Sequence, residues 1–198
     1  KPFADKISVD GRIYEAYSDF VLVTVVGLEK NVGAAEDWNF DRFRAAYAAL
    51  PPGAAVFDDG GTAEFILGEL LSGGIYDFVD FEHAACDFES GEFASMLEFA
   101  ASAAGNEHEG ESFAAMENGE LLLSTAYVYE PGMYALYRAH STKEEVSVVG
   151  YPSKSGGTAL LFAGGGFAIS AASAHKEAAW EFVKQLLTEE NQSKSLEN

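Results

Sequence analysis

The sequence predicts an α/β fold, and three observations predict it. Short apolar runs rich in β-branched residues, typical of buried strands, recur along the chain, and the clearest is residues 20–26. Between these runs lie segments that repeat apolar side chains every three or four residues, as an amphipathic helix requires. With 198 residues, 48% of them hydrophobic, the chain can bury a sizeable core in one large or two small domains.

The chain opens with a predicted hairpin and a predicted strand. Asp10-Gly11 is a turn signal between two short stretches of strand-forming residues, which indicates a hairpin or a strand entry. Residues 20–26 follow, and Gly27 bounds them. We therefore expect a buried strand over this run.

Helix signals recur through the rest of the chain. Asn39, Ser90 and Ser173 precede amphipathic segments, and their side chains are of the type that caps a helix N-terminus. Trp38 and Trp180 are expected to be structural, each anchoring an apolar helix face. The predicted helices are residues 40–50, 63–71, the segment after Ser90, 113–117, a short helix containing Leu136 and Tyr137, and 176–187.

Further strands are predicted at residues 54–57, 121–123 and 146–149. Residues 127–134 read as a loop that carries three tyrosines. The triplet Gly164-Gly165-Gly166 is not followed by Lys-Ser or Lys-Thr, which excludes a P-loop. It predicts a positive φ or a close backbone approach, either at a sharp crossing between domains or beside a ligand.

The charge of the chain excludes two classes of partner. Twelve basic residues against 32 acidic ones give a net charge of −20. Nucleic acid and anionic membrane surfaces both need clustered Lys and Arg, so neither is an expected partner. The longest apolar stretch, residues 20–27, is far shorter than the roughly 20 residues of a membrane-spanning helix.

No catalytic or metal-binding constellation stands out. Cys86 is the single cysteine, which excludes an internal disulfide and a zinc site of several thiolates, and we expect it to be a buried or half-buried loop residue. The four histidines are widely separated, and the acidic run over residues 77–87 favours a solvated face over a calcium loop. We predict no metal, no cofactor and no enzymatic activity. The carboxylate pair of a glycoside hydrolase stays open as an alternative, because the separation of two carboxylates is a tertiary property.

Two tyrosines indicate a sugar platform. Tyr127 and Tyr129 alternate around Val128, which places both on one face of an extended segment, with Thr125 and Glu130 nearby. Aromatic faces next to carboxylates suit a sugar, whose C–H face packs on the ring while its hydroxyls donate to the acid. A cluster of core tyrosines is the other interpretation of the same pattern.

Several motifs, taken in order, resemble one family. Tyr151-Pro152-Ser153, then Gly164-Gly-Gly-Phe-Ala-Ile-Ser170, then Lys176-Glu-Ala-Ala-Trp-Glu-Phe182 form the most specific match. Asp10-Gly-Arg-Ile-Tyr14 and Trp38-Asn-Phe-Asp-Arg-Phe43 add to it. The order of these segments resembles the extracellular solute-binding proteins of ABC importers, in the sugar-binding branch related to maltose-binding protein.

The resemblance implies a partial chain with a helix-rich periplasmic-binding-protein type II lobe and a mixed central sheet. Residues 1–27 would be the hinge entry and the end of a first lobe, residues 28–160 the second lobe, and residues 161–198 the return crossing and a helix of the first lobe. The first lobe would be incomplete, and a signal segment with a lipid-attached cysteine is expected before Lys1.

The function implied is that of the extracellular component of an ABC importer, a membrane-tethered lipoprotein or periplasmic protein and a monomer. It would bind a sugar in a cleft between the lobes and present it to the permease. A glycoside hydrolase-like enzyme, or a binding protein for a peptide or polyamine, are the alternatives. Carried over position by position, the ligand-facing residues are Tyr17, Ser18, Thr62, Glu64, Phe65, Tyr127, Tyr129, Gly164, Gly165, Gly166 and Phe167.

Overall fold

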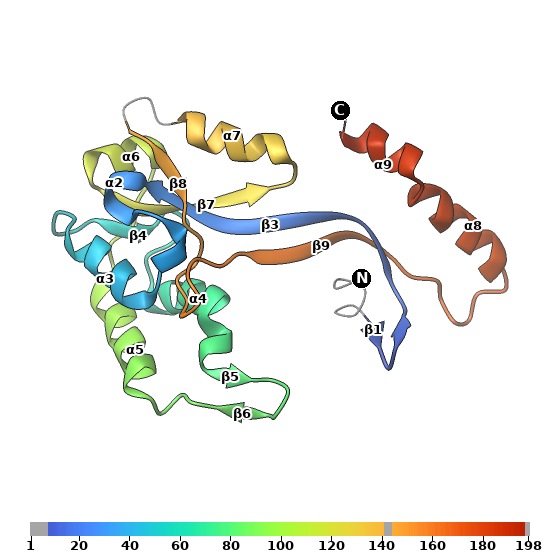
Figure 1. The fold of residues 1–198 in the computed structure, drawn as a ribbon, viewed down its shortest axis with the longest axis horizontal. Coiled ribbons are helices and arrows are strands. Elements are labelled where there is room, and N and C mark those ends of the chain that lie inside the picture. The colour runs from blue at the N-terminus through green and yellow to red at the C-terminus, as the bar shows by residue number, and fades with distance from the viewer. Residues whose placement is uncertain (1–7, 141–143, 197–198) are drawn as a thin grey trace. The chain divides into compact units, whose positions relative to one another are not determined.

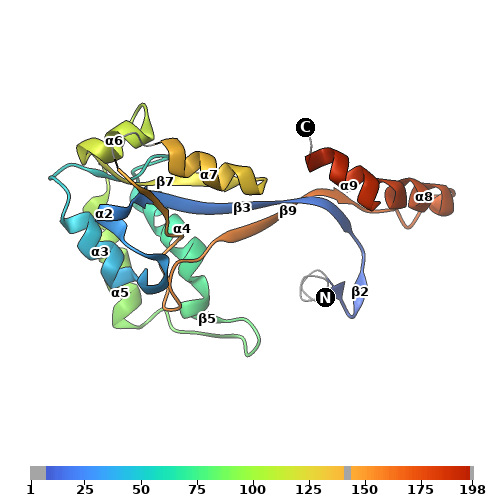
Figure 2. The same cartoon turned by 45° about the horizontal axis from the view of Figure 1, so that its top comes forward.

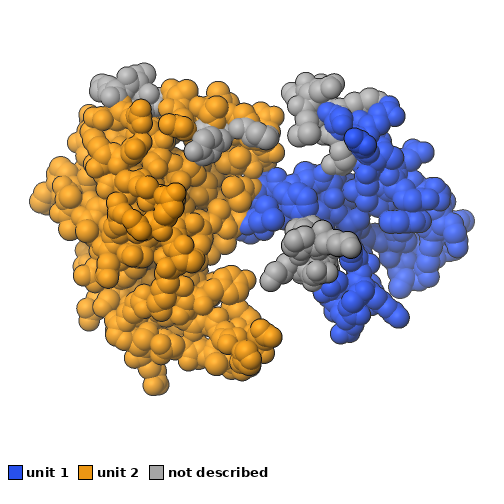
Figure 3. All heavy atoms as spheres, in the orientation of Figure 1, with its two compact units in different colours: residues 1–21, 161–198 blue, residues 22–160 orange. Residues whose placement is uncertain are grey.

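The computed structural model describes residues 8–140 and 144–196 (Figure 1). The chain divides into two compact units (Figure 3). Unit 1 comprises residues 1–21 and 161–198, and unit 2 comprises residues 22–160. Helices and strands occur together in both units, so the predicted α/β class is confirmed. The assignment of residues 28–160 to a second lobe stays a prediction.

A mixed sheet of five strands organises the fold. The order along the sheet is β4-β7-β3-β8, and β9 also pairs with β3. β4 runs parallel to β7, whereas β7 and β8 are antiparallel to β3. The strands are β3 (Ala16–Leu28), β4 (Ala55–Phe57), β7 (Leu121–Val128), β8 (Val146–Val148) and β9 (Leu160–Phe167).

Helices of unit 2 cover both faces of its part of the sheet (Figure 2). Side chains alternate along a strand, so Val25 and Val26 of β3 point to opposite faces. Val25 lies in the larger core cluster, to which α3, α4 and α5 contribute, and Val26 lies in the smaller one, against α6 and α7. These helices are α3 (Phe40–Ala48), α4 (Ala63–Gly74), α5 (Gly91–Ala103), α6 (Ser112–Asn118) and α7 (Pro131–His140).

Side-chain caps fix the starts of three of these helices. Asn39 accepts a hydrogen bond from the Arg42 backbone N–H, at 3.0 Å, and Ser90 caps α5 in the same way, so both predicted caps are confirmed. Thr62 caps α4. Unit 2 also contains the short α2 (Glu29–Val32) and the 3₁₀ turns η1 (Ala35–Asp37) and η2 (Ile75–Asp77). Across the described ranges, no helix combines the length and the apolar character needed to cross a membrane.

The larger core cluster is rich in aromatic rings. Trp38 is fully buried and meets the edge of Phe43, as expected for a structural tryptophan. Phe43 also stacks on Phe57 of β4 and contacts Phe99 of α5. The rings therefore join the sheet to α3 and α5, and burying each of them stabilises the fold by about 1.5–3 kcal/mol.

A small hairpin projects from unit 2 after η2. β5 (Val79–Asp80) pairs antiparallel with β6 (Ala85–Cys86). Cys86 is exposed and lies in a strand, so its expected place as a buried or half-buried loop residue was wrong.

Unit 1 contains the predicted N-terminal hairpin and two C-terminal helices. β1 (Ser8–Val9) pairs with β2 (Arg12–Ile13) across the Asp10-Gly11 turn, as predicted. Helix α8 (Lys176–Leu186) begins where the sequence indicates, but Ser173 is not its cap, because its hydroxyl accepts from the His175 backbone N–H before the helix starts. A further helix, α9 (Glu189–Leu196), follows it.

Trp180 does not occupy a core position. Its side chain is 48% exposed, and Phe182 of the same helix is 62% exposed. Only Val183 of this helix is buried.

Two predicted boundaries were wrong for identifiable reasons. The helix expected to end at residue 71 continues to Gly74. Gly73 does not end the helix but allows it to pack closely against Tyr151, because a Cβ at residue 73 would overlap that side chain. The predicted tyrosine loop, residues 127–134, is reduced to residues 129 and 130. Tyr127 lies in β7, and Pro131 opens α7, where its missing N–H costs no helical hydrogen bond.

Candidate functional site

The turn after β4 is held in place by one carboxylate. Asp58 is the first residue after this strand, and its Oδ1 accepts a hydrogen bond of 3.0 Å from the Thr125 backbone N–H of β7. Its Oδ2 accepts from the Ser112 hydroxyl at 2.7 Å, at the start of α6. Asp58 thus links the end of β4 to β7 and α6. Both of its carboxylate oxygens accept hydrogen bonds from within the chain.

The same turn packs closely against the loop after α5. The Gly105 backbone N–H donates to the Gly61 carbonyl at 2.8 Å. A Cβ at Gly61 would collide with the backbone of Asn106. Glycine is therefore required at residue 61 for close backbone approach, and the turn from Asp58 to Thr62 has little freedom to move.

Five residues of unit 2 form an acidic–tyrosine cluster around this turn: Asp58, Asp59, Glu69, Tyr127 and Tyr151. Tyr151 is only 2% exposed, and its hydroxyl donates to the Glu69 carboxylate of α4. Asp59 is exposed, Glu69 is half-buried, and Tyr127 is 43% exposed at the end of β7.

The pKa shifts of the cluster reflect burial and mutual repulsion. Burial, and then the charge of Glu69, raises the pKa of Tyr151 far above its ordinary value. Burial also raises the pKa of Glu69, with the charges of Asp59 and Asp58 adding to it, while the Tyr151 hydrogen bond opposes the shift. Desolvation followed by the charge of Asp59 raises the pKa of Tyr127. The cluster therefore favours an occupant that donates hydrogen bonds or carries positive charge.

The predicted aromatic residues Tyr127 and Tyr129 lie beside this cluster. The backbone N–H of Tyr127 donates to the Tyr137 hydroxyl of α7 at 3.0 Å, and that hydroxyl donates back to the Tyr127 carbonyl at 3.2 Å. Tyr129 is 61% exposed, and its charge adds to the raised pKa of Tyr127. Neither tyrosine is buried in the core, which was the alternative interpretation.

The predicted residues at the start of α4 have different roles. The Thr62 hydroxyl accepts from the Phe65 backbone N–H at 3.2 Å, so it caps the helix. Phe65 is half-buried with its ring edge against Phe57, which makes it a packing residue at the rim of the core. Glu64 is exposed in the first turn of α4. None of the charge interactions given above involves Glu64.

The other predicted residues belong to unit 1, on β3 and β9. The Ser18 hydroxyl donates to Asp19 Oδ2 at 2.8 Å and lies 3.4 Å from the Gly165 carbonyl. The Tyr17 hydroxyl donates to Glu15, and this hydrogen bond is the main cause of its raised pKa. All three glycines and Phe167 lie in β9, and Gly165 has a φ of +53°. The expectation of a positive φ in the triplet is therefore confirmed.

Sequence reasoning missed four members of the cluster: Asp58, Asp59, Glu69 and Tyr151. Asp58 and Asp59 directly follow an apolar strand, and this position was a usable signal, because strand ends deliver side chains to one sheet edge. Tyr151 follows β8 in the same manner. Glu69 had no local signal, since only the packing of α4 brings it to Tyr151.

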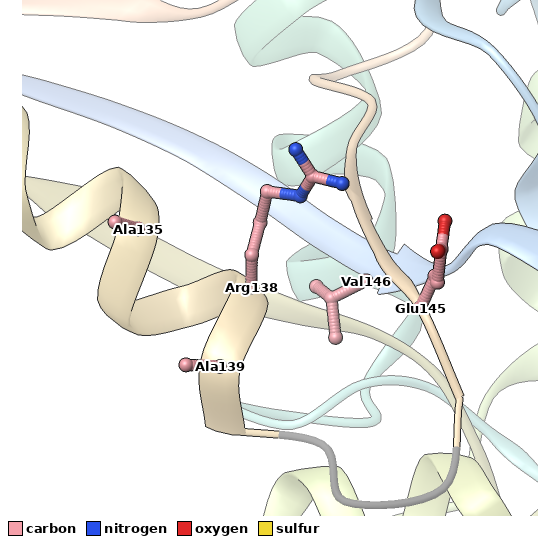
Figure 4. Close-up of a pocket in the computed structure, with 5 residues that line it drawn as sticks. All are labelled: Ala135, Arg138, Ala139, Glu145 and Val146. Carbon is pink, nitrogen blue, oxygen red and sulfur yellow. The ribbon is translucent and has the colours of Figure 1, made fainter.

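Other hollows of unit 2 hold none of the predicted residues. A groove of about 390 Å³ lies between α7 and β8, where Arg138 and Glu145 project on either side of Val146 (Figure 4). A second, of about 460 Å³, is lined by the first residues of α3 and α5 together with Lys154. Within the described residues, no group of three or more His, Cys, Asp or Glu side chains is placed to hold a metal ion.

The chain matches the family model of the bacterial extracellular solute-binding proteins over residues 30–193. A search of curated proteins gives no match. The aligned range includes every member of the acidic–tyrosine cluster.

Several solved structures share the fold. An ABC transporter solute-binding protein from Thermotoga lettingae, bound with α-D-tagatose, is 16% identical with a TM-score of 0.55, over 99% of this chain and 55% of its own. An ABC substrate-binding protein from Listeria monocytogenes, in complex with cycloalternan, is 15% identical with a TM-score of 0.58, over 98% and 53%. The sugar-binding protein MalE from Xanthomonas citri is 16% identical with a TM-score of 0.61, over 96% and 52%. The chain thus spans about half the length of the structures that it matches.

Proposed function

Because the chain belongs to the family of bacterial extracellular solute-binding proteins, we propose that it is the solute-binding part of an ABC importer and that its solute is a sugar or oligosaccharide. The family consists of binding proteins, which agrees with the predicted absence of enzymatic activity. Two of the matched proteins are bound with α-D-tagatose and in complex with cycloalternan, and a third is a sugar-binding protein, which supports a sugar as the class of solute.

The acidic–tyrosine cluster is the observation that carries the proposal. Tyr127 and Tyr129 offer exposed aromatic surface on which the C–H face of a sugar can pack. Asp59 and Glu69 offer carboxylate oxygens that accept hydrogen bonds from sugar hydroxyls, and such charge-assisted bonds are about twice as strong as neutral ones. The rigid turn at Asp58 holds this arrangement in place before the ligand arrives, which lowers the entropy cost of binding.

Unit 2 would then supply one wall of the ligand site. The predicted residues Glu64, Thr62 and Phe65 lie outside the cluster or serve the helix start, so we assign them supporting roles. The predicted residues of unit 1, from Tyr17 to Ser18 and from Gly164 to Phe167, stay candidates by resemblance. Export, tethering as a lipoprotein, a monomeric state and delivery to permease subunits are proposed on the same ground.

Saturation-transfer difference NMR with glucose, maltotriose and chitotriose tests the sugar. We expect at least one of them to receive saturation from the chain. The substitution Tyr127→Ala should lower the affinity for that sugar about thirtyfold, which corresponds to about 2 kcal/mol, because it removes an aromatic face on which the sugar stacks. Tyr129→Ala should act in the same direction.

The matched control is Leu97→Ala, which truncates an exposed apolar residue of α5 that is not a member of the cluster. It should leave the affinity unchanged. If Tyr127→Ala and Tyr129→Ala both bind the sugar like the parent and only unfold at a lower temperature, the tyrosines are structural and the proposal fails. Cleavage of the oligosaccharides during the measurement would likewise contradict it.

A cationic solute such as a polyamine is the second candidate, and one observation favours it. The charges of Asp58, Asp59 and Glu69 all act on Tyr127, and those of Asp59 and Asp58 also act on Glu69, so an ammonium group would relieve this repulsion. Spermidine in the same NMR experiment separates the two candidates. If the chain binds spermidine but none of the sugars, and Asp59→Asn abolishes the spermidine binding, the solute is a polyamine and not a sugar.

A further inference from the structure

The segment from Ile75 to Ser90, which we call the acidic hairpin, combines two surface properties that the ligand site does not use. It contains η2, β5 and β6 and belongs entirely to unit 2. Its two outermost aromatic side chains are Tyr76, 78% exposed, and Phe81, 65% exposed. Large aromatic side chains exposed to this degree commonly mark interaction surfaces rather than packing.

Tyr76 and Phe81 form a pair. Their ring centroids lie 5.5 Å apart with an interplanar angle of 65°, so one ring edge meets the other face. The pair keeps both rings in a defined orientation while leaving most of their surface in solvent. Association with a partner would therefore bury aromatic surface without first having to order it.

The base of the hairpin is firmly attached to unit 2. Phe78 is 3% exposed, and its ring centroid lies 5.3 Å from that of Phe93 on α5. The ring centroid of Phe88 lies 4.9 Å from that of Phe93. The Asp87 backbone N–H donates to the Phe78 carbonyl at 2.8 Å. The Lys154 backbone N–H also donates a hydrogen bond to Asp77 Oδ2 at 2.8 Å. The exposed pair thus stands on an anchored support.

The tip of the hairpin is fixed by Asp80. Its Oδ1 accepts from the backbone N–H groups of Glu82 and His83, each at 3.0 Å, and its Oδ2 lies 2.8 Å from His83 Nδ1. Ala84 turns the chain with a φ of +50°. Phe81 lies within this closed turn, so its position follows from local hydrogen bonds.

The charge of the hairpin selects the kind of partner. Residues 75–90 contain five carboxylates and neither Lys nor Arg, which gives a local charge of −5 with His83 neutral. Among the described residues, the side chains of Glu82 and Glu89 make no hydrogen bond or ion pair, so their charges are available. An arginine guanidinium fits both properties at once, because it stacks on aromatic rings and pairs with carboxylates.

We propose that the acidic hairpin is a docking surface for an arginine-bearing segment of another protein. The Tyr76–Phe81 pair would receive the guanidinium on its faces, and the carboxylates around it would supply the counter-charge. Lysine would fit less well, since its compact, strongly hydrated ammonium does not stack in the same manner. The inference is independent of the solute bound elsewhere in unit 2.

The test uses the whole 198-residue chain, labelled with ¹⁵N, and three twelve-residue peptides of alternating glycine and arginine, glycine and lysine, or glycine and glutamate. We expect the arginine peptide to shift amide signals within residues 75–90 and to bind at least five times more tightly than the lysine peptide. The glutamate peptide should not bind.

Variants separate local docking from the general attraction of a chain with a charge of −20. The double change Tyr76→Ser and Phe81→Ser should weaken the arginine peptide at least tenfold, and so should Glu82→Gln with Glu89→Gln. The matched control is Glu98→Gln with Glu120→Gln, which removes two exposed charges elsewhere in unit 2 and should change the affinity less than twofold. Near-ultraviolet circular dichroism of each variant confirms that the fold is retained.

Three results would overturn the proposal. In one, the peptide shifts signals across the whole acidic surface and the hairpin variants bind like the control. In another, the chain binds vesicles of phosphatidylcholine and loses this binding in the Tyr76→Ser, Phe81→Ser variant, which would make the occupant a membrane. In the third, sedimentation shows self-association that the same variant abolishes, which would make the occupant a second copy.

Discussion

Two carboxylates of the acidic–tyrosine cluster, Asp58 and Glu69, have different surroundings. Asp58 accepts hydrogen bonds from Thr125 and Ser112, so its charge is satisfied within the fold. Glu69 is half-buried on α4, where burial and the charges of Asp59 and Asp58 disfavour its ionised form. At the scale of the residue, one acid stabilises the structure and the other makes it sensitive to pH.

The raised pKa of Glu69 predicts the direction of this sensitivity. The folded state holds the proton more tightly than the unfolded chain, so the contribution of Glu69 to stability is fully present below its ordinary pKa of 4.5 and is lost as the pH rises through the raised value. Glu69→Gln cannot ionise but still accepts the Tyr151 hydrogen bond. We therefore expect this variant to gain stability relative to the parent between pH 4 and pH 7.

Urea unfolding at both pH values measures the difference. Glu98→Gln, at an exposed site on α5, is the control and should follow the parent across the range. Parallel curves for Glu69→Gln and the parent would show that burial of this carboxylate does not matter for stability.

At the scale of the element, glycines decide several boundaries by different physical means. Gly119 ends α6 in the left-handed conformation, with a φ of +78°. Gly73 lies inside α4, where its missing side chain lets the helix approach Tyr151. Gly165 of β9 has a φ of +53°, and a Cβ there would meet the Ser18 hydroxyl. The same residue type thus terminates, packs or turns the chain.

A pair of Gly→Ala substitutions tests this distinction with the same chemical change. Gly68 lies within α4 and a Cβ there would meet open space, so Gly68→Ala should stabilise the chain by about 0.5–1 kcal/mol through helix propensity. Gly165→Ala should destabilise it by about 1–3 kcal/mol because of its positive φ. Thermal unfolding of both variants gives the two signs, and a Gly165→Ala variant that melts like the parent would show that the conformation at this residue is not restrictive.

Local chemistry made most of the elements predictable, and long-range packing accounts for the rest. The caps at Asn39 and Ser90 and the Asp10-Gly11 turn act within a few residues, so the sequence shows them. The extension of β7 as far as Val128 depends on its pairing with β3, which no local pattern displays. The site follows the same rule: Tyr127 and Tyr129 were visible as an alternating pair, whereas Glu69 joins them only through the position of α4.

At the scale of the whole molecule, the net charge of −20 opposes compaction. Among the described residues, four ion pairs of Lys or Arg with a carboxylate offset it, and these lie at the surface, where such pairs contribute about 0–1 kcal/mol each. Hydrophobic burial in the two core clusters therefore carries the stability against the repulsion among the acids.

Moderate salt should accordingly stabilise the chain. Screening shortens the reach of each charge, to about 8 Å at physiological ionic strength, and a gain of about 1 kcal/mol would raise Tm by about 2–4 °C. Differential scanning calorimetry in 10 mM and 150 mM NaCl measures this change. Sucrose of equal osmolarity is the control, and a Tm that does not respond to NaCl would show that the acids are too far apart to repel.

The place of β3 in the sheet has a consequence for synthesis of the protein. Its apolar stretch from Val23 to Leu28 leaves the ribosome before the strands that pair with it, because β7 and β8 come about a hundred residues later in the chain. At about 5–20 residues per second, the chain would spend roughly 5–20 s with this stretch unpaired. During that interval an exposed β-branched segment is prone to pair with other chains, so the nascent protein depends on protection from aggregation until its own partner strands arrive.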